Sequence, residues 1–202
     1  MSKNESPFNP EAQQKEIENK IVASLERISQ IFRSLLWKQA KSFNLTPLQI
    51  QILIFLKYHN DEKSCVSYLS KEFNLSKPTV SEAISTLIKK GLIKKRKNLE
   101  DNRRQSFLLT ESGIELTEKI ELFAFPIKEI IKSFNQNEKQ ALWESLIRII
   151  SQANRKGLIP LQRMCFTCKF YERRQGTDFC KLLDTELKIH QIRIDCPEFI
   201  EA

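Results

Sequence analysis

The 202-residue chain is poor in glycine, histidine, tryptophan and methionine, with four, two, two and two residues respectively. So few glycines favour helices over sheets. The chain has no apolar run long enough to cross a bilayer, and Met1-Ser2-Lys3-Asn4-Glu5 lacks the apolar stretch of a secretory signal. It also lacks a phosphate-binding glycine loop and a nucleophile motif, which argues against an enzyme. We therefore expect a mainly helical, cytoplasmic protein with no membrane partner and no catalytic activity.

The composition that is present is that of a globular protein, with 41% hydrophobic and 29% charged residues. The length allows one main domain and an appendage. Thirty-three lysines and arginines against 25 acidic residues leave a formal net charge of +8, which favours an anionic partner. Charge alone does not separate nucleic acid from a membrane surface.

The stretch from Leu75 to Leu92 has the pattern of a helix that is recognised from outside. Ser76 can cap its start, Pro78 fits its first turn, and Gly91 supplies a left-handed residue at its end. An apolar face recurs at helical spacing in Val80, Ile84, Leu87 and Ile88. The other face carries small hydroxyls and charges on Lys77, Thr79, Ser81, Glu82, Ser85 and Lys89. Such a face suits contacts with phosphates and base edges, although an ordinary amphipathic surface helix has the same pattern.

Two helices are expected before this stretch. Thr46 and Gln49 have the spacing of a capping box, with Pro47 between them, and predict a helix to about Tyr58. A second helix is expected from about Val66 to Phe73. This second helix and the helix from Leu75 to Leu92 are joined by a tight turn. Because the latter exposes small polar residues, the pair has the pattern of a helix-turn-helix.

A basic hairpin is expected after the helix from Leu75 to Leu92. Residues 93–97 and 103–109 have the pattern of two strands around a polar turn. Side chains that can reach DNA are predicted on both arms and at the tip: Arg96, Lys97, Asn102, Arg103 and Arg104. A solvated surface hairpin is the alternative, but the position directly after a helix-turn-helix favours a wing.

Long amphipathic helices flank this unit. They are expected from about residue 13 to 43, from Thr110 to about Phe134 with a kink at Pro126, and from Asn135 to near Gly157. Their apolar faces exceed what one winged helix can cover, so part of this surface should meet a second copy of the chain.

The order of elements across about residues 13 to 155 resembles the MarR family of transcriptional regulators. The matching segments are Leu45-Thr46-Pro47-x-Gln49, the helix ending in Lys90-Gly91-Leu92-Ile93, Asp101-Asn102-Arg103, and Leu109-Thr110-Glu111-x-Gly113. The resemblance implies a homodimer with interlocked terminal helices on a pseudo-palindromic operator in double-stranded DNA, and a repressor. It places Lys77, Thr79, Ser81 and Ser85 in the major groove, makes Arg103 the wing arginine held by Asp101, and implies a small-molecule effector near the dimer interface. This sequence departs from the family pattern at Glu82 and Asn102.

A cysteine-rich segment follows. Cys165 and Cys168 form a C-x-x-C pair, and Cys180 and Cys196 follow singly. Four thiolates can complete a tetrahedral metal site, and a segment of this size has little core without one. We therefore predict one zinc ion per chain, with a [4Fe–4S] cluster as the alternative. With a cluster, the protein would be a regulator that responds to redox state, iron or oxygen. Redox-switch thiols and unrelated buried cysteines are the further alternatives.

The remaining cysteine and both histidines are given structural roles. Cys65 is expected to be a small buried residue or a poor helix cap, and His59 and His190 to lie on the surface. The predicted organisation is a flexible segment at 1–12, a winged helix with dimerisation helices at 13–156, and a metal-binding module at 157–202. The predicted fold class is mainly α with a small β-wing and a small C-terminal four-cysteine metal module.

Overall fold

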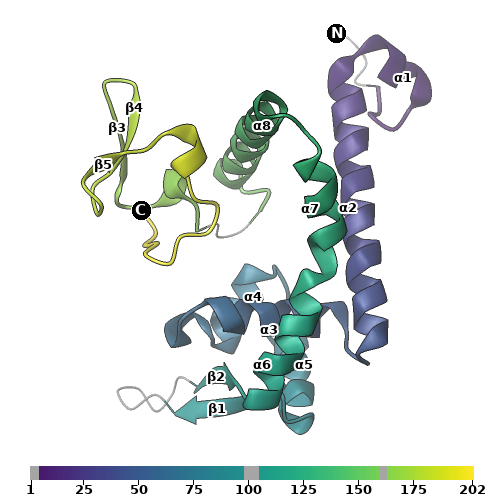
Figure 1. The fold of residues 1–202 in the computed structure, drawn as a ribbon, viewed down its shortest axis with the longest axis vertical. Coiled ribbons are helices and arrows are strands. Elements are labelled where there is room, and N and C mark those ends of the chain that lie inside the picture. Colours follow the sequence, from purple (N-terminus) through teal and green to yellow (C-terminus); the bar gives the residue numbers. More distant parts are fainter. Residues whose placement is uncertain (1–4, 98–104, 160–162) are drawn as a thin grey trace.

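The computed structural model describes residues 5–97, 105–159 and 163–202, and its fold is mainly helical with two small antiparallel sheets (Figure 1). The N-terminal part consists of α1 (Pro10–Lys15), α2 (Ile17–Ser42), α3 (Pro47–Tyr58), η1 (Asp61–Lys63), α4 (Val66–Glu72) and α5 (Lys77–Lys89). The strands β1 (Ile93–Lys97) and β2 (Gln105–Leu109) follow, and then α6 (Glu111–Ile120), η2 (Glu121–Ala124), α7 (Phe125–Lys132) and α8 (Gln136–Arg155). The C-terminal part contains η3 (Cys165–Thr167), β3 (Tyr171–Arg174), β4 (Thr177–Cys180), β5 (Thr185–Glu186) and η4 (Ile189–Gln191). No helix within the described ranges combines the length and apolar character of a membrane span.

The predicted helix starts are confirmed by their side-chain caps. Thr46 and Gln49 form a complete capping box on α3, and Asn135 and Glu138 form another on α8. The Ser76 hydroxyl accepts a hydrogen bond from the backbone N–H of Thr79 at the start of α5.

Two predicted helices are interrupted, which corrects the sequence-based picture. The helix expected from residue 13 to 43 breaks at Glu16, whose extended backbone separates α1 from α2. Asn9 caps α1, so part of the segment expected to be flexible is helical. The helix expected through Phe134 ends at Ile120, and η2 separates it from α7. Pro126 stands in the first turn of α7, because proline fits the beginning of a helix better than its interior.

The winged-helix part has one apolar core. Buried side chains from α2 through α6 and from both strands of the hairpin form it, including Ile50, Leu53, Leu69, Val80, Leu87, Ile93, Phe107 and Ile120. The hairpin pairs β1 with β2 antiparallel, with Ile93 opposite Leu109. In Figure 1, α5 and this hairpin lie at the same end of the molecule, far from α1.

The C-terminal residues form a second core together with α8. Ile147 of α8 is buried against Met164, Leu187 and Ile192, and the Trp143 indole N–H donates to the carbonyl oxygen of Ile189 at 3.0 Å. We call residues 163–202 the cysteine module. Its three strands have the order β3-β4-β5, and its packing on α8 was not predicted from the sequence.

Gly113 of α6 lies against the chain segment that leads into β1. A Cβ atom at this position would stand 2.0 Å from the carbonyl oxygen of Leu92, which also accepts the backbone N–H of Thr110 at 3.0 Å. A backbone atom fixed by a hydrogen bond cannot move away cheaply. Gly113 is therefore required by the close contact between the start of α6 and the hairpin.

We expect Gly113→Ala to destabilise the protein. Alanine normally favours a helix by about 1 kcal/mol over glycine. Here the contact with the Leu92 backbone should outweigh this gain and lower the free energy of unfolding by about 1–3 kcal/mol. Urea unfolding measures the change, with Glu115→Ala at an exposed position of the same helix as the control. Wild-type stability of the Gly113 variant would contradict the close contact.

Candidate nucleic-acid interface and cysteine cavity

The helix α5 is anchored on one side and open on the other. Val80, Ala83, Ile84 and Leu87 are buried in the core. Gly91, with φ +69°, ends the helix in the left-handed region, and its carbonyl accepts the Thr110 hydroxyl. The backbone of α5 is thus fixed at both ends, which presents its outer side chains in one orientation.

The predicted DNA-contacting residues of α5 all lie on the exposed side of the helix. They are Lys77, Pro78, Thr79, Ser81, Glu82, Ser85 and Lys89. The Thr79 hydroxyl is 2.8 Å from that of Ser76, so it takes part in the cap as well as facing outward. Small hydroxyls flanked by lysines can accept or donate hydrogen bonds at base edges while the cations face phosphates.

The first arm of the hairpin adds cations beside α5. Lys94, Lys95 and Arg96 of β1 are exposed, and the Arg96 carbonyl accepts the Ser106 hydroxyl at 3.5 Å. The side chain of Lys97 and the whole of Asn102, Arg103 and Arg104 lie outside the described part of the structure. The predictions for these four residues therefore stay predictions.

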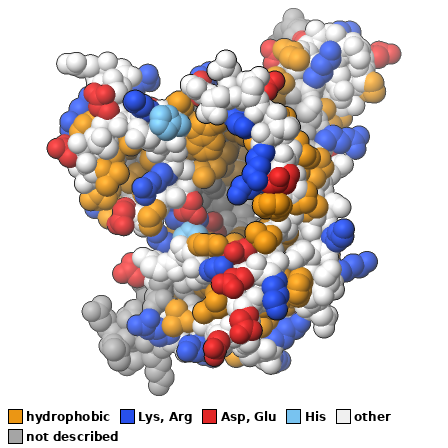
Figure 2. All heavy atoms as spheres, viewed as in Figure 1, with side chains coloured by type: hydrophobic (Ala, Val, Ile, Leu, Met, Phe, Trp, Pro, Cys, Tyr) orange, Lys and Arg blue, Asp and Glu red, His pale blue; other side chains and the backbone are white. Residues whose placement is uncertain are grey.

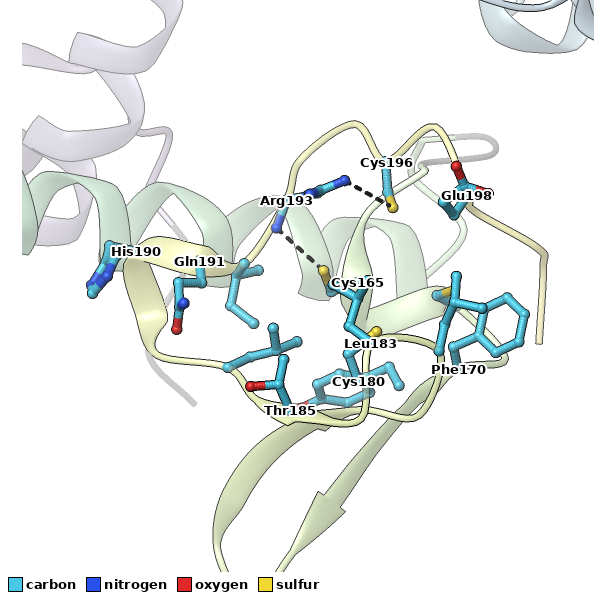
Figure 3. Close-up of a pocket in the computed structure, with 15 residues that line it drawn as sticks. Cys165, Phe170, Cys180, Leu183, Thr185, His190, Gln191, Arg193, Cys196 and Glu198 are labelled. Atoms are coloured by element: carbon cyan, nitrogen blue, oxygen red, sulfur yellow. Dashed lines mark hydrogen bonds between the residues drawn. The ribbon is translucent and has the colours of Figure 1, made fainter.

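All four cysteines of the predicted metal module line one cavity of about 390 Å³ (Figure 3). Cys165 and Cys168 come from the turn around η3, where the N–H of Cys168 donates to the carbonyl of Cys165 at 3.0 Å. Cys180 ends β4, and Cys196 lies in the loop after η4. The turn, the sheet and the loop thus bring together residues that are far apart in the sequence.

Hydrogen-bond donors face two of the thiols. The backbone N–H of Arg193 donates to Sγ of Cys165 at 3.2 Å, and the Arg193 guanidinium is 3.9 Å from Sγ of Cys196 (Figure 3). Burial raises the pKa of the Cys165 thiol, while the Arg193 N–H acts in the opposite direction. A bound metal would favour the thiolates, because it replaces their protons.

The four cysteines predicted to bind zinc line the same cavity but do not form a compact group of ligands. Within the described ranges, no three His, Cys, Asp or Glu side chains are grouped closely enough to hold one metal ion. His190 also lines the cavity and is exposed, as expected. Cys65 begins α4 without a side-chain cap, which agrees with the expectation of a poor cap.

A buried arginine joins the cysteine module to the winged helix. Nε and Nη2 of Arg163 donate to the two carboxylate oxygens of Asp195 at 2.7 and 3.0 Å. The same guanidinium donates through both terminal nitrogens to Glu72 of α4. It lies 5.1 Å from the ring centroid of Phe55 in α3. The Arg163 side chain is only 7% exposed, so its charge depends on these carboxylates.

The hydrogen bonds between Arg163 and its carboxylate partners favour the charged forms of Arg163 and Asp195. Burial acts to lower the pKa of Arg163, but hydrogen bonds to Asp195 and Glu72 outweigh burial and raise it. Burial likewise acts to raise the pKa of Asp195, but hydrogen bonds from His59 and Arg163 hold it well below its usual range. Arg163 and Asp195 are therefore both ionised at neutral pH.

The prediction that His59 is an ordinary surface residue is wrong. Its side chain is 10% exposed, its ring stacks on Phe55 with centroids 3.9 Å apart, and its ring nitrogens lie 2.8 Å from the Phe55 carbonyl and 3.0 Å from Asp195. Sequence reasoning missed this residue, Arg163, Glu72 and Asp195 as a group. Their only sequence signal is that Asp195 precedes Cys196 and Arg163 lies two residues before Cys165.

The winged-helix part is similar to known regulators. Residues 43–104 match the MarR family model. The chain is 28% identical over 99 residues to the HTH-type transcriptional regulator SarZ of Staphylococcus haemolyticus, an alignment that spans 49% of this chain and 67% of that protein. It is 34% identical over 104 residues to the uncharacterized HTH-type transcriptional regulator YdgJ of Bacillus subtilis, spanning 50% of this chain and 62% of YdgJ, less than two thirds of its length.

Solved structures share the fold. A crystal structure of the S. aureus MepR–DNA complex matches with a TM-score of 0.56 and 23% identity, covering 65% of this chain and 96% of that one. A MarR transcriptional regulator from Methanosarcina mazei matches with a TM-score of 0.54 and 22% identity, covering 69% and 97%. Residues 43–104 therefore match the MarR family model, and the described part of the chain has the winged-helix fold seen in these solved structures.

Proposed function

We propose that the protein is a DNA-binding transcriptional regulator that acts as a homodimer on a pseudo-palindromic operator, as a repressor. The observation that carries this proposal is the rigidly capped α5, which exposes a row of small hydroxyls and lysines next to the cationic strand β1. The match to the MarR family and the names of the relatives support it. Regulation requires binding, not catalysis, in agreement with the lack of enzyme motifs.

The two kinds of side chain on α5 have different tasks in this proposal. The hydroxyls of Ser81 and Ser85 contact base edges in the major groove, where they distinguish sequences. Lys77 and Lys89, at the two ends of the helix, contact phosphates and contribute a salt-dependent affinity for any DNA. Glu82 disfavours close approach of a phosphate and restricts which register the helix can adopt.

We expect substitutions in α5 to separate these tasks. Lys77→Ala should weaken binding to all DNA sequences and lower the salt slope of log K by about 1, because one phosphate contact is lost. Ser81→Ala should instead change the relative affinity for operator variants, by about 1–3 kcal/mol at the contacted position. Fluorescence anisotropy with a set of DNA duplexes at several salt concentrations measures both.

Lys119→Ala is the matched control, since Lys119 is an exposed cation of α6 outside the proposed interface. If Lys77→Ala and Ser81→Ala both bind like the wild type, α5 does not enter the groove as proposed.

The dimer is supported by apolar side chains that the single chain leaves exposed. They lie along α2 and α7, and include Ile17, Ile21, Ile28, Ile31, Trp37, Phe125 and Ile130. In Figure 2, hydrophobic side chains also gather around the hollow in the middle of the displayed face. An apolar surface of this extent on two helices is suited to burial against a second copy. A small-molecule effector near that interface stays a prediction.

We expect Ile28→Glu to weaken the dimer. In the dimer Ile28 would be buried against the partner chain. Replacing it with a carboxylate should raise the dimer dissociation constant at least about tenfold. Sedimentation equilibrium measures the constant, and Gln30→Glu introduces the same charge on the same exposed helix as a control. A monomeric wild type at micromolar concentration would contradict the dimer, as would equal effects of both substitutions.

A second candidate function, a regulator whose cysteine module is the sensor, is favoured by the Arg163 contacts. The carbonyl of Arg163 accepts the backbone N–H of Cys196 at 2.9 Å, while its side chain binds Glu72 of α4. Lys63 adds a contact from η1 to the carbonyl of Pro197 at 3.3 Å. Arg163 therefore provides a route by which a change around Cys196 would reach α4, the helix that precedes α5.

We expect Glu72→Gln to reduce this coupling. The amide keeps the shape of the carboxylate but removes the charge that pairs with Arg163 across the two parts. Metal removal should change the DNA affinity of the wild type by about 5-fold to 150-fold, the usual range of coupling between sites. The change should be smaller in Glu72→Gln, whereas Glu62→Gln on the exposed surface of η1 should behave like the wild type. Equal DNA affinity with and without metal in the wild type would refute the sensor role.

A further inference from the structure

The four cysteines of the cysteine module line a cavity and do not form the compact set of ligands that a single ion needs. In a zinc site with four cysteine ligands each sulfur lies about 2.3 Å from the metal, so the four sulfurs surround one point and leave no space between them. Here the four cysteines line a cavity of about 390 Å³, and no three metal-binding side chains among the described residues form a compact set. A water molecule needs about 10–15 Å³ of such volume, so this cavity, which extends past the cysteines to Thr185 and Glu198, has room for a group of several atoms.

We propose that this cavity binds a [4Fe–4S] cluster through Cys165, Cys168, Cys180 and Cys196. A cluster with four iron atoms takes one thiolate at each iron, so its ligands surround a volume and need not converge. Each thiol releases its proton when its sulfur binds iron. The proposal goes beyond DNA binding and does not depend on it.

The surroundings of the cavity fit such a cluster. Apolar side chains line part of the wall, among them Phe170, Leu187 and Ile192, of which Leu187 and Ile192 are buried. The shell of apolar residues and hydrogen bonds to sulfur are the features by which proteins stabilise and tune clusters. The Arg193 N–H already donates to the sulfur of Cys165, and the Arg193 guanidinium offsets negative charge near Cys196.

The positions of the four cysteines also support one site with four ligands. Cys180 is paired with Tyr171 and Thr185 in the small sheet, which fixes its backbone. It lines the same cavity as Cys165 and Cys168 of the turn around η3. Cys196 is held by its backbone N–H, which donates to the carbonyl of Arg163. The fifth cysteine, Cys65, stands before the first residue of α4 and is not part of the cavity lining.

The test is metal and sulfide analysis of the full chain purified without air, together with its visible spectrum. We expect four iron and four sulfide per chain, and broad visible absorption that bleaches on reduction. Treatment of metal-free protein with ferric iron, sulfide and dithiothreitol should restore the same spectrum. One zinc and no iron per chain would overturn the proposal, as would two iron and two sulfide, or metal-free protein that takes up no cluster in this treatment.

Cysteine variants identify the ligands. Cys165→Ser with Cys168→Ser should lose the cluster, whereas Cys65→Ser should keep its full iron and sulfide content. A double variant that retains wild-type cluster content would refute the ligand set. Because the wild-type stoichiometry is measured without DNA and without any variant, an unstable variant does not affect the main test, and failure of the DNA-binding proposal would leave the cluster result unchanged.

Discussion

The buried guanidinium of Arg163 imposes a constraint on both parts of the molecule. A charge that is 7% exposed needs partners that replace its water, and here Asp195 of the cysteine module and Glu72 of α4 provide them. Removing either carboxylate leaves an imperfectly paired buried charge and so weakens the contact between the two parts. His59 adds a contact from the end of α3 to Asp195. The cysteine module is therefore attached to the winged helix by charge pairing, and to α8 by apolar packing.

This arrangement joins two sites that are remote in the sequence. Cys196 follows Asp195 directly, and Glu72 lies at the end of α4, one turn before the cap of α5. A cluster that ligates Cys196 would hold the loop that carries Asp195, and the same loop positions Arg163 against α4. Hydrogen bonds of Arg163 thus connect the loop that carries Cys196 with α4, the helix that precedes α5. Such a path is a physical means of coupling, and the DNA affinity of metal-free protein decides whether it is used.

The sequence predicted best those features whose signals are local. Ser76, Pro78 and Gly91 mark the limits of α5 by capping chemistry and by a left-handed turn, and both depend on residues within one helical turn. The periodic apolar residues then determine which face of α5 packs on the core. For this reason all the exposed residues of α5 were predicted. The breaks at Glu16 and between α6 and α7 were missed, because periodic apolar residues continue across them. The Arg163 group was also missed, since its partners are separated by 32 and 91 residues.

In the cysteine module, the spacing of the cysteines in the sequence does not determine which metal they would bind. The C-x-x-C pair and the two single cysteines could be the four ligands of one zinc ion or of a cluster. The spacing does not distinguish the two, because the distances between the sulfurs depend on the fold between the cysteines. That fold consists of a turn, a three-stranded sheet and a loop held by Arg163, and it places the cysteines around a space instead of at a point. Ligand identity is encoded locally, whereas ligand separation is set by contacts with the winged helix and α8. The separation of the four sulfurs, which would distinguish one zinc ion from a cluster, therefore depends on the same contacts that attach the module to the winged helix and α8.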